Sequence, residues 1–289
     1  MANIQKIKEL REMTQAGMMD CKKALDASND DINKAVIWLR EKGISKAAKK
    51  ASRIAAEGVC ACTVDGNRCV VYELNCETDF VSSNATFQAL VEQIGQALVD
   101  GKFTNDEDAL NVEYEGTKVS DIIINATATI GEKISLRRIS QLTKKDNQIF
   151  GSYSHMGGKI VTVVILDGDN ENIAKDVCMH VAAMNPKYLG RDSIDADYIK
   201  NETEILRQEA LNEGKPEKIV DKMVVGRLNK SLKEVCLLEQ SFVKEPDLTV
   251  GQYVKNNKCA VVSFTRLMVG EGIEKKKCDL AAEVAEALK

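Results

Sequence analysis

The first 53 residues carry a helical pattern of apolar positions that two short polar stretches interrupt. Three segments place apolar side chains three or four residues apart, as in a helix that buries one face. These segments are Ile4, Ile7 and Leu10, then MMDCKKALDAS, then Ile32, Ala35, Val36 and Leu39. Asp30 precedes the third segment and is a favourable N-cap. The pattern predicts a compact bundle of three short helices, whose small core gives modest stability on its own.

The segment EKGISKAAKKASR, residues 41–53, is basic and rich in alanine but has little apolar stripe. Two interpretations are open: a solvated helix or linker that leaves the bundle, or a patch that binds nucleic acid. We favour the first, because a run of charges is more often a solvated face than a binding site. Residues 1–53 are therefore the expected N-terminal domain with its linker.

From Ala55 the pattern changes to short β-rich runs followed by helices. GVCACTVDGNRCVVYELNC consists of two such runs around the turn sequence Asp-Gly-Asn, which predicts a hairpin. Apolar residues three or four apart between Phe87 and Leu98 predict a helix. A further helix and a strand near residues 134–139 follow.

The same order of elements recurs in the second half of the chain. GSYSHMGGKIVTVVILDGDN forms two extended runs around Gly157-Gly158, and the helical segment after it ends at Asn185-Pro186. The late strand KCAVVSFTRLMVG resembles EKISLRRISQL of the first half. Sequence identity between the halves is faint, so we describe a structural echo. The fold class predicted is α+β, with antiparallel sheets in core subdomains 54–145 and 146–289.

Two amphipathic helical segments interrupt the second subdomain at about residues 195–230. The first runs over residues 198–211 and the second carries Ile219, Val220, Met223, Val224 and Leu228. A Gly-Lys-Pro turn joins them, which predicts an antiparallel helical hairpin. Its narrow apolar stripes suit a two-helix arm.

Composition and charge favour a folded protein without a dedicated nucleic-acid surface. The 289 residues are 44% hydrophobic and 29% charged, and the net charge is −4 with both signs mixed. A nucleic-acid binder would instead be basic. Nine cysteines without paired C-x-x-C spacing, among them Cys60 and Cys62 on one face of a strand, are expected to be buried thiols of a reducing compartment. No run of signal-peptide or membrane-spanning length occurs, so we expect a soluble cytoplasmic protein.

The residues of a catalytic site do not come together in the sequence, so we do not expect an enzyme. The two histidines are His155, in an expected turn, and His180, on the buried face of an expected helix. The stretch DGDNEN resembles half of a calcium loop, but Asn172 and Cys178 occupy the positions that need Gly and Glu. The catalytic motifs that we sought, such as G-x-S-x-G, H-E-x-x-H and the P-loop, are missing. We expect no cofactor and no metal.

One short stretch, NCETDFV, combines features that rarely occur together. Asp79 and Phe80 follow directly after the apolar run RCVVYELN. A loop normally solvates its aspartate and hides its phenylalanine, so the pair indicates a surface that something else contacts.

Two long motifs resemble the bacterial elongation factor Ts family: LREMTQAGMMDCKKAL at residues 10–25 and NCETDFVSSNATF at residues 75–87. The similarity extends to AMNPKYL, GKPEKIVDKMVVGRLNK and VGEGIEKKKCDLAAEVA, and so covers essentially the whole chain. The resemblance implies a guanine-nucleotide exchange factor for elongation factor Tu, in its GDP-bound and nucleotide-free forms. It also implies an N-terminal module similar to ubiquitin-associated domains, a coiled-coil arm, and a C-terminal module at about 271–289.

The resemblance also implies which residues contact the partner. In the family the T-D-F-V segment inserts near the nucleotide and Mg²⁺ of the GTPase, which matches Thr78, Asp79, Phe80 and Val81 here. An arginine and two methionines of the N-terminal module contact a helix of the GTPase, and they match Arg11, Met18 and Met19. Without the match, at least one of these methionines would be expected in the core.

The resemblance leaves several further points as expectations. A C-terminal helix at residues 279–288 would also contact the partner. Glu77 stands where glutamine is familiar and adds a charge beside the segment. A homodimer or a complex with two copies of each protein is possible, and neither direct nucleic-acid binding nor membrane binding is expected.

Two other functions compete with this interpretation. The N-terminal bundle alone suggests a ubiquitin-like binding module, but it covers only a sixth of the chain. Cys76 could serve as the nucleophile of a thiol enzyme together with Asp79 and a distant histidine. Apart from the resemblance, the residues indicate an α+β interaction protein.

Overall fold

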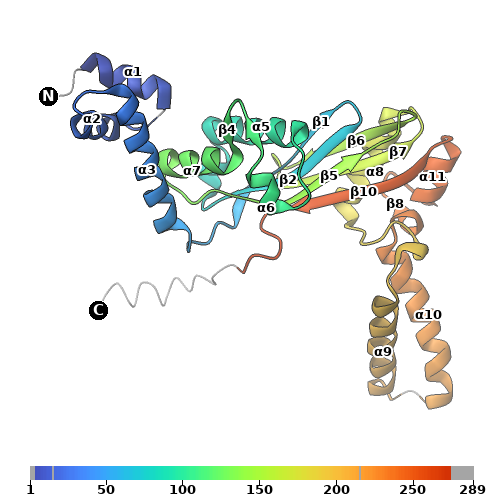
Figure 1. Ribbon diagram of the computed structural model, residues 1–289. Helices are drawn as coiled ribbons and strands as arrows, with labels where there is room; N and C mark the ends of the chain where they lie inside the picture. The colour runs from blue at the N-terminus through green and yellow to red at the C-terminus, as the bar shows by residue number, and fades with distance from the viewer. Residues whose placement is uncertain (1–3, 15, 215, 275–289) are drawn as a thin grey trace. The chain divides into compact units, whose positions relative to one another are not determined.

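The computed structural model describes residues 4–14, 16–214 and 216–274 (Figure 1). Its contacts divide the chain into two compact units. Of the described residues, the first unit comprises those within 4–65, 70–141 and 268–274, and the second comprises those within 66–69 and 142–267. Both units combine helices with sheets, so the predicted α+β class is confirmed. The proposed boundaries at residues 53 and 145 stay predictions.

Three helices open the first unit: α1 (Ile4–Thr14), α2 (Met18–Ala27) and α3 (Ile32–Lys50). Their apolar faces meet in a small core that includes Leu10, Leu25 and Ala35, all of which are fully buried. The predicted N-cap is wrong by one residue, because the Asp31 side chain accepts the hydrogen bond from the Lys34 amide, at 3.0 Å. Asp30 has a positive φ of 58° and belongs to the preceding turn.

Helix α3 is longer than the predicted apolar stripe, because it continues through the basic segment to Lys50. Alanine and lysine both favour a helix, which explains why this segment does not unravel into a linker. One face of it packs on α7 (Val119–Ile130): Gly43 is buried, and a Cβ built on it would lie 3.5 Å from the Ala128 Cβ. The segment is therefore partly a packing surface and not only a solvated face.

The rest of the first unit is a three-stranded sheet covered by helices. The strand order is β1-β2-β5, formed by β1 (Glu57–Asp65), β2 (Arg68–Cys76) and β5 (Ser135–Thr143). Helix α5 (Ala85–Asp100) packs on this sheet, and the buried Tyr72 hydroxyl of β2 donates to the Val91 carbonyl oxygen of α5 at 2.6 Å. The shorter elements are α4 (Asp79–Ser82), α6 (Asp106–Leu110), and the two-stranded sheet of β3 (Glu113–Tyr114) with β4 (Thr117–Lys118).

The second unit repeats the arrangement of hairpin, helix and late strand. Its sheet has the order β10-β7-β6, from β6 (Gln148–His155), β7 (Ile160–Asp167) and β10 (Ala260–Met268). Strands β6 and β7 pair antiparallel, with a register that runs from Gln148 opposite Asp167 to His155 opposite Ile160. The remaining elements are α8 (Glu171–Met184), η1 (Arg191–Ser193), η2 (Leu237–Glu239), β8 (Ser241–Phe242), β9 (Glu245–Thr249) and α11 (Val250–Asn256).

The predicted helical hairpin consists of α9 (Ala196–Asn212) and α10 (Glu217–Val235), which lie side by side in Figure 1. A small apolar core of Ala210, Val220 and Val224 holds the two helices together. Ion pairs flank it: Arg227 lies 2.8 Å from Glu213, and Arg207 lies 3.1 Å from Asp221. These exposed pairs contribute little individually, so the short apolar seam sets the pairing.

Helices within the described ranges are all too short or too polar to cross a membrane. The expected C-terminal helix at residues 279–288 and the end of the C-terminal module lie outside the described residues.

Candidate partner-binding site

The segment Thr78–Val81 begins where strand β2 leaves the sheet. All residues of β2 from Cys69 to Cys76 are buried, so the strand forms a fixed base. Thr78 is the N-cap of the short helix α4, and its side-chain oxygen accepts from the Val81 amide at 3.4 Å. Asp79 and Phe80 are thus the first residues of a capped helical turn and not part of an open loop.

Side chains of this turn point in two directions. Phe80 is 85% exposed, the largest exposed fraction among the large hydrophobic side chains of the described residues, and Asp79 beside it is exposed too. Val81 packs against the core of the first unit, and Ser82 is buried with its hydroxyl donating to the Asp79 carbonyl oxygen at 3.0 Å. Two inward residues therefore anchor a turn that presents an aromatic ring and a carboxylate to the outside.

Glu77, the departure from the family pattern, is an ion-paired residue. Its carboxylate lies 3.3 Å from the Arg53 guanidinium and accepts from the Lys133 amide at 2.7 Å. Its side chain therefore points toward the turn between α7 and β5, where a positive side chain offsets its charge.

Glu132, in that same turn, is a functional candidate that sequence reasoning missed. Its carboxylate accepts from the amides of both Glu77 and Thr78, which precede it by more than fifty positions. A glutamate between a helix and a strand is typical of a solvated turn, so no local pattern distinguishes it.

The three residues predicted in the N-terminal module all lie on its surface. Met18 and Met19 open helix α2 and are 55% and 62% exposed, so neither methionine belongs to the core. Arg11 lies in the last turn of α1 and is exposed. The structure thus places two flexible apolar side chains and one cation on the outside of one small bundle, separate in the sequence from Thr78–Val81.

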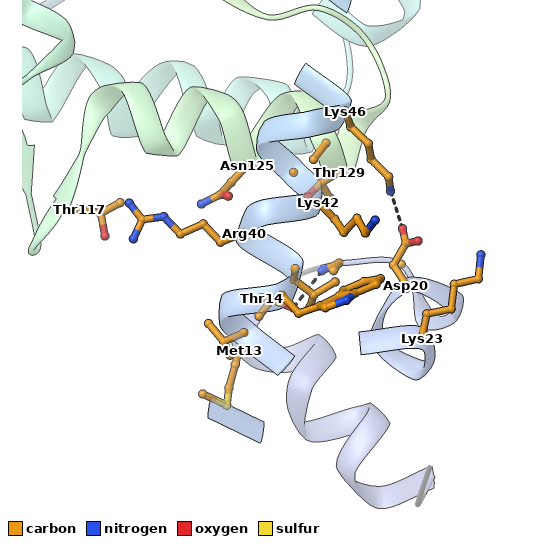
Figure 2. A pocket seen from close by; sticks show the side chains of 17 residues that line it. Met13, Thr14, Asp20, Lys23, Arg40, Lys42, Lys46, Thr117, Asn125 and Thr129 are labelled. Carbon is orange, nitrogen blue, oxygen red and sulfur yellow. Dashed lines mark hydrogen bonds and ion pairs between the residues drawn. The ribbon is translucent and has the colours of Figure 1, made fainter. Parts of the chain in front are cut away.

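A pocket of about 750 Å³ lies beside this surface, between the α1–α2 turn, α3 and α7 (Figure 2). Several of its cationic side chains already have partners. Lys46 lies 2.8 Å from Asp20, and Arg40 lies 2.5 Å from Asp121. Lys42 sits over the Trp38 ring, 5.4 Å from its centroid. Of these three cations, Lys46 belongs to the basic segment and has its charge offset by a carboxylate, whereas Lys42 faces a neutral ring.

The surroundings of the cysteines disfavour the thiol-enzyme alternative. Cys76 is fully buried, and its thiol donates to the Thr78 carbonyl oxygen at 3.1 Å. Burial raises the pKa of the Cys60 thiol to about 12, and it also raises the pKa of Cys21 and Cys236 above the ordinary value. Because the thiolate is the nucleophile, these groups are less reactive than an exposed cysteine.

The remaining candidates for chemistry are accounted for by packing. His180 is fully buried and donates from Nε2 to the Gln240 Oε1 at 2.9 Å, as expected of a core histidine. His155 ends strand β6 at the surface, 3.1 Å from the Tyr153 hydroxyl. Within the described ranges, no three side chains of His, Cys, Asp or Glu come close enough to hold a metal ion.

These features define the class: an α+β protein that exposes apolar side chains on two structured segments, the α4 turn and the start of α2. Residues 77–271, about two thirds of the chain, match the family described as Elongation factor TS, and the chain belongs to this family. The resemblance inferred from the motifs is thereby confirmed. The match begins at Glu77, so it includes the α4 turn and leaves out Arg11, Met18 and Met19.

Membership in the family implies nucleotide exchange on elongation factor Tu in translation elongation. The partner that the family implies is therefore this GTPase, and the family is one of exchange factors.

Proposed function

We propose that the chain promotes GDP release from elongation factor Tu by inserting the α4 turn next to the nucleotide and its Mg²⁺. The observation that carries this proposal is the exposure of Phe80, at 85%, on a turn whose other side is anchored in the core. An isolated exposed apolar side chain is common on proteins, but one held on a capped turn beside a carboxylate is ready to enter a partner.

The energetics suit a wedge. Burial of a phenylalanine side chain contributes about 1.5–3 kcal/mol, which can offset displacement of partner elements that hold the nucleotide. Mg²⁺ at a nucleotide site takes only one or two protein ligands and otherwise binds phosphate and water, so small displacements weaken it. Asp79 either orients the turn in the complex or interacts near the displaced metal.

The N-terminal module supplies the second contact of this proposal. Arg11, Met18 and Met19 bind a helix of the GTPase, and methionine side chains suit such a surface because they adapt to irregular shapes. In the same proposal the bundle is a module similar to ubiquitin-associated domains, the α9–α10 hairpin is a coiled-coil arm, and residues 279–288 add a C-terminal contact. Assembly is either one copy of each protein or two.

Exchange of this kind needs a coupling free energy and no general acid or base. If the chain lowers the affinity for GDP by a given factor, GDP must lower the affinity for the chain by the same factor. GTP can then rebind and release the chain from the nucleotide-free complex. The chain is proposed to act in the cytoplasm, where elongation takes place.

Measurement of both affinities tests the proposal. Fluorescent GDP release from elongation factor Tu should accelerate with rising concentration of the chain, and saturating GDP should weaken the complex by the factor found for GDP. An unchanged release rate at saturating chain would reject the proposed activity.

A further inference from the structure

We propose that Glu132 is a positioning residue for exchange, which holds the α4 turn so that Phe80 is presented in one direction. This inference rests on the proposed role of Thr78–Val81. Glu132 lies in the turn between α7 and β5. The hydrogen bonds that carry the inference join it to Glu77 and Thr78 and do not involve the exposed side chains of Asp79 and Phe80.

Three hydrogen bonds converge on the Glu132 carboxylate. Its Oε2 accepts from the Glu77 amide at 2.9 Å and from the Thr78 amide at 3.0 Å. Its Oε1 accepts from the Thr78 hydroxyl at 2.6 Å. Hydrogen bonds to an ionised acceptor are shorter and stronger than neutral ones, so a single side chain fixes the two residues that join β2 to α4.

The Thr78 hydroxyl transmits this constraint to the helical turn. It donates its proton to Glu132 and accepts from the Val81 amide, so both functions of one oxygen are used. The contact with Glu132 therefore selects the side-chain rotamer that caps α4. A helix of four residues has few hydrogen bonds of its own, so its geometry depends on this cap.

Glu132 and Glu77 each accept a hydrogen bond from a backbone amide of the other's segment, and we call this reciprocal set of contacts the brace. While Glu132 accepts from the amides at 77 and 78, Glu77 accepts from the Lys133 amide at 2.7 Å. Gly131 ends α7 with a φ of 89°, a conformation that favours glycine and turns the next two residues toward Glu77. The Lys133 ammonium donates to the carbonyl oxygens of Ala51 and Arg53 at 2.7 Å and 2.9 Å, which fastens the turn to the chain after α3.

The brace favours exchange by ordering the turn before binding, which burial of Phe80 alone does not do. A turn fixed before binding loses less conformational freedom when it enters the partner, and it applies the full burial of Phe80 in one direction. Without Glu132 the same Phe80 can still touch the partner, but it does so from many orientations. Removal of Glu132 should therefore lower the maximal exchange rate more than it weakens binding, because other surfaces of the chain also contribute to binding.

The test compares full-length variants by stopped-flow release of fluorescent GDP from elongation factor Tu over a range of factor concentrations. Glu132→Ala removes the brace, and Glu132→Gln keeps one oxygen acceptor with the same shape. Thr78→Val removes the hydroxyl, whereas Thr78→Ser retains it. Glu107→Gln, at an exposed position of α6, controls for loss of one negative charge.

We expect Glu132→Ala to lower the maximal rate about tenfold, with less than a twofold change in the half-saturating concentration. Glu132→Gln should lose less, and Thr78→Ser should lose less than Thr78→Val. Because Glu132 and the Thr78 hydroxyl share one hydrogen bond, the loss of rate in the double variant Glu132→Ala with Thr78→Val should be smaller than the product of the two single losses. Glu107→Gln should match the unaltered chain.

Three results would overturn the inference: a maximal rate for Glu132→Ala within twofold of the unaltered chain, an effect confined to the half-saturating concentration, or losses that multiply in the double variant. Thermal denaturation identifies any variant that fails to fold. If Glu132→Ala is one of these, Glu132→Gln and the Thr78 pair decide the question. A Phe80→Ala variant with full activity would instead reject the proposed function itself, so the two failures are distinguishable.

Discussion

The Glu73 carboxylate accepts a hydrogen bond from the Gly270 amide at 2.7 Å, although 197 residues separate the two positions. Glu73 is fully buried in strand β2, and the guanidinium Nε atoms of Arg138 and Arg137 lie 2.7 Å and 3.1 Å from its other oxygen. Asn75 donates to the first oxygen at 2.8 Å. This carboxylate therefore ties the chain after β10 to the sheet of the first unit.

We predict that Glu73→Gln lowers the free energy of unfolding by about 3 kcal/mol, because it removes the buried counter-charge of two partly buried guanidinium groups, of which Arg138 keeps only the half-exposed Glu271, at 2.8 Å. Glutamine still offers an acceptor to the Gly270 amide, so Glu73→Ala should cost more. Urea denaturation followed by circular dichroism measures both values, with Glu107→Gln as the control. Equal stability of Glu73→Gln and the unaltered chain would show that the ion pairs contribute nothing net.

The N-terminal surface makes a separate prediction. Met19→Ala should weaken the complex with elongation factor Tu at least fivefold, about 1 kcal/mol, because it removes an apolar side chain proposed to be buried by the partner. The melting temperature should stay unchanged, since the side chain is 62% exposed in the free chain. Isothermal titration and differential scanning calorimetry give the two values.

Met156→Ala is the matched control for Met19, because Met156 is 73% exposed in the β6–β7 turn of the other unit. Equal affinities for both variants would remove Met19 from the interface. A lower melting temperature for Met19→Ala would assign it to the bundle core.

We predict that the buried His180 makes the folded chain less stable in mild acid. Burial lowers the pKa of its imidazole, against a smaller opposite effect of the hydrogen bond with Gln240. The Val243 amide donates to Nδ1 at 3.3 Å, so a proton on that nitrogen would break this hydrogen bond. The folded chain therefore binds this proton more weakly than the unfolded chain, and folding stability is lost as the pH falls below about 6.5.

The free energy of unfolding measured between pH 7.5 and 5 should thus fall more steeply for the unaltered chain than for His180→Gln. The difference can reach about 1.4 kcal/mol for each unit by which the pKa is lowered. Parallel curves would mean that His180 protonates equally well in both states.

Periodicity predicted the elements of this fold because most helices and strands bury one continuous face. The apolar positions of α5 and the hairpin of α9 and α10 follow directly from residue spacing. The start of α3 was misplaced by one residue, since Asn29 and Asp30 both adopt positive φ and delay the helix to Ile32. Residue spacing alone does not show which of the two neighbouring aspartates, Asp30 or Asp31, caps the helix.

The candidate site was only partly accessible from sequence. The resemblance identified Thr78–Val81, and the pairing of Asp79 with Phe80 indicated a contacted surface. Glu132 was missed because its contacts with Glu77 and Thr78 join segments that only the fold brings together. Contacts of this kind depend on where the α7–β5 turn meets the end of β2, and no spacing within either segment specifies that meeting.

The central claim is that an aromatic side chain on the α4 turn drives nucleotide release. Its most direct test is the release of fluorescent GDP from elongation factor Tu at saturating concentrations of Phe80→Ala, with Met156→Ala as the control. We predict that Phe80→Ala slows stimulated release about tenfold or more, from the loss of about 1.5–3 kcal/mol of burial, while Met156→Ala does not. Release by Phe80→Ala at the rate of the unaltered chain would contradict the claim.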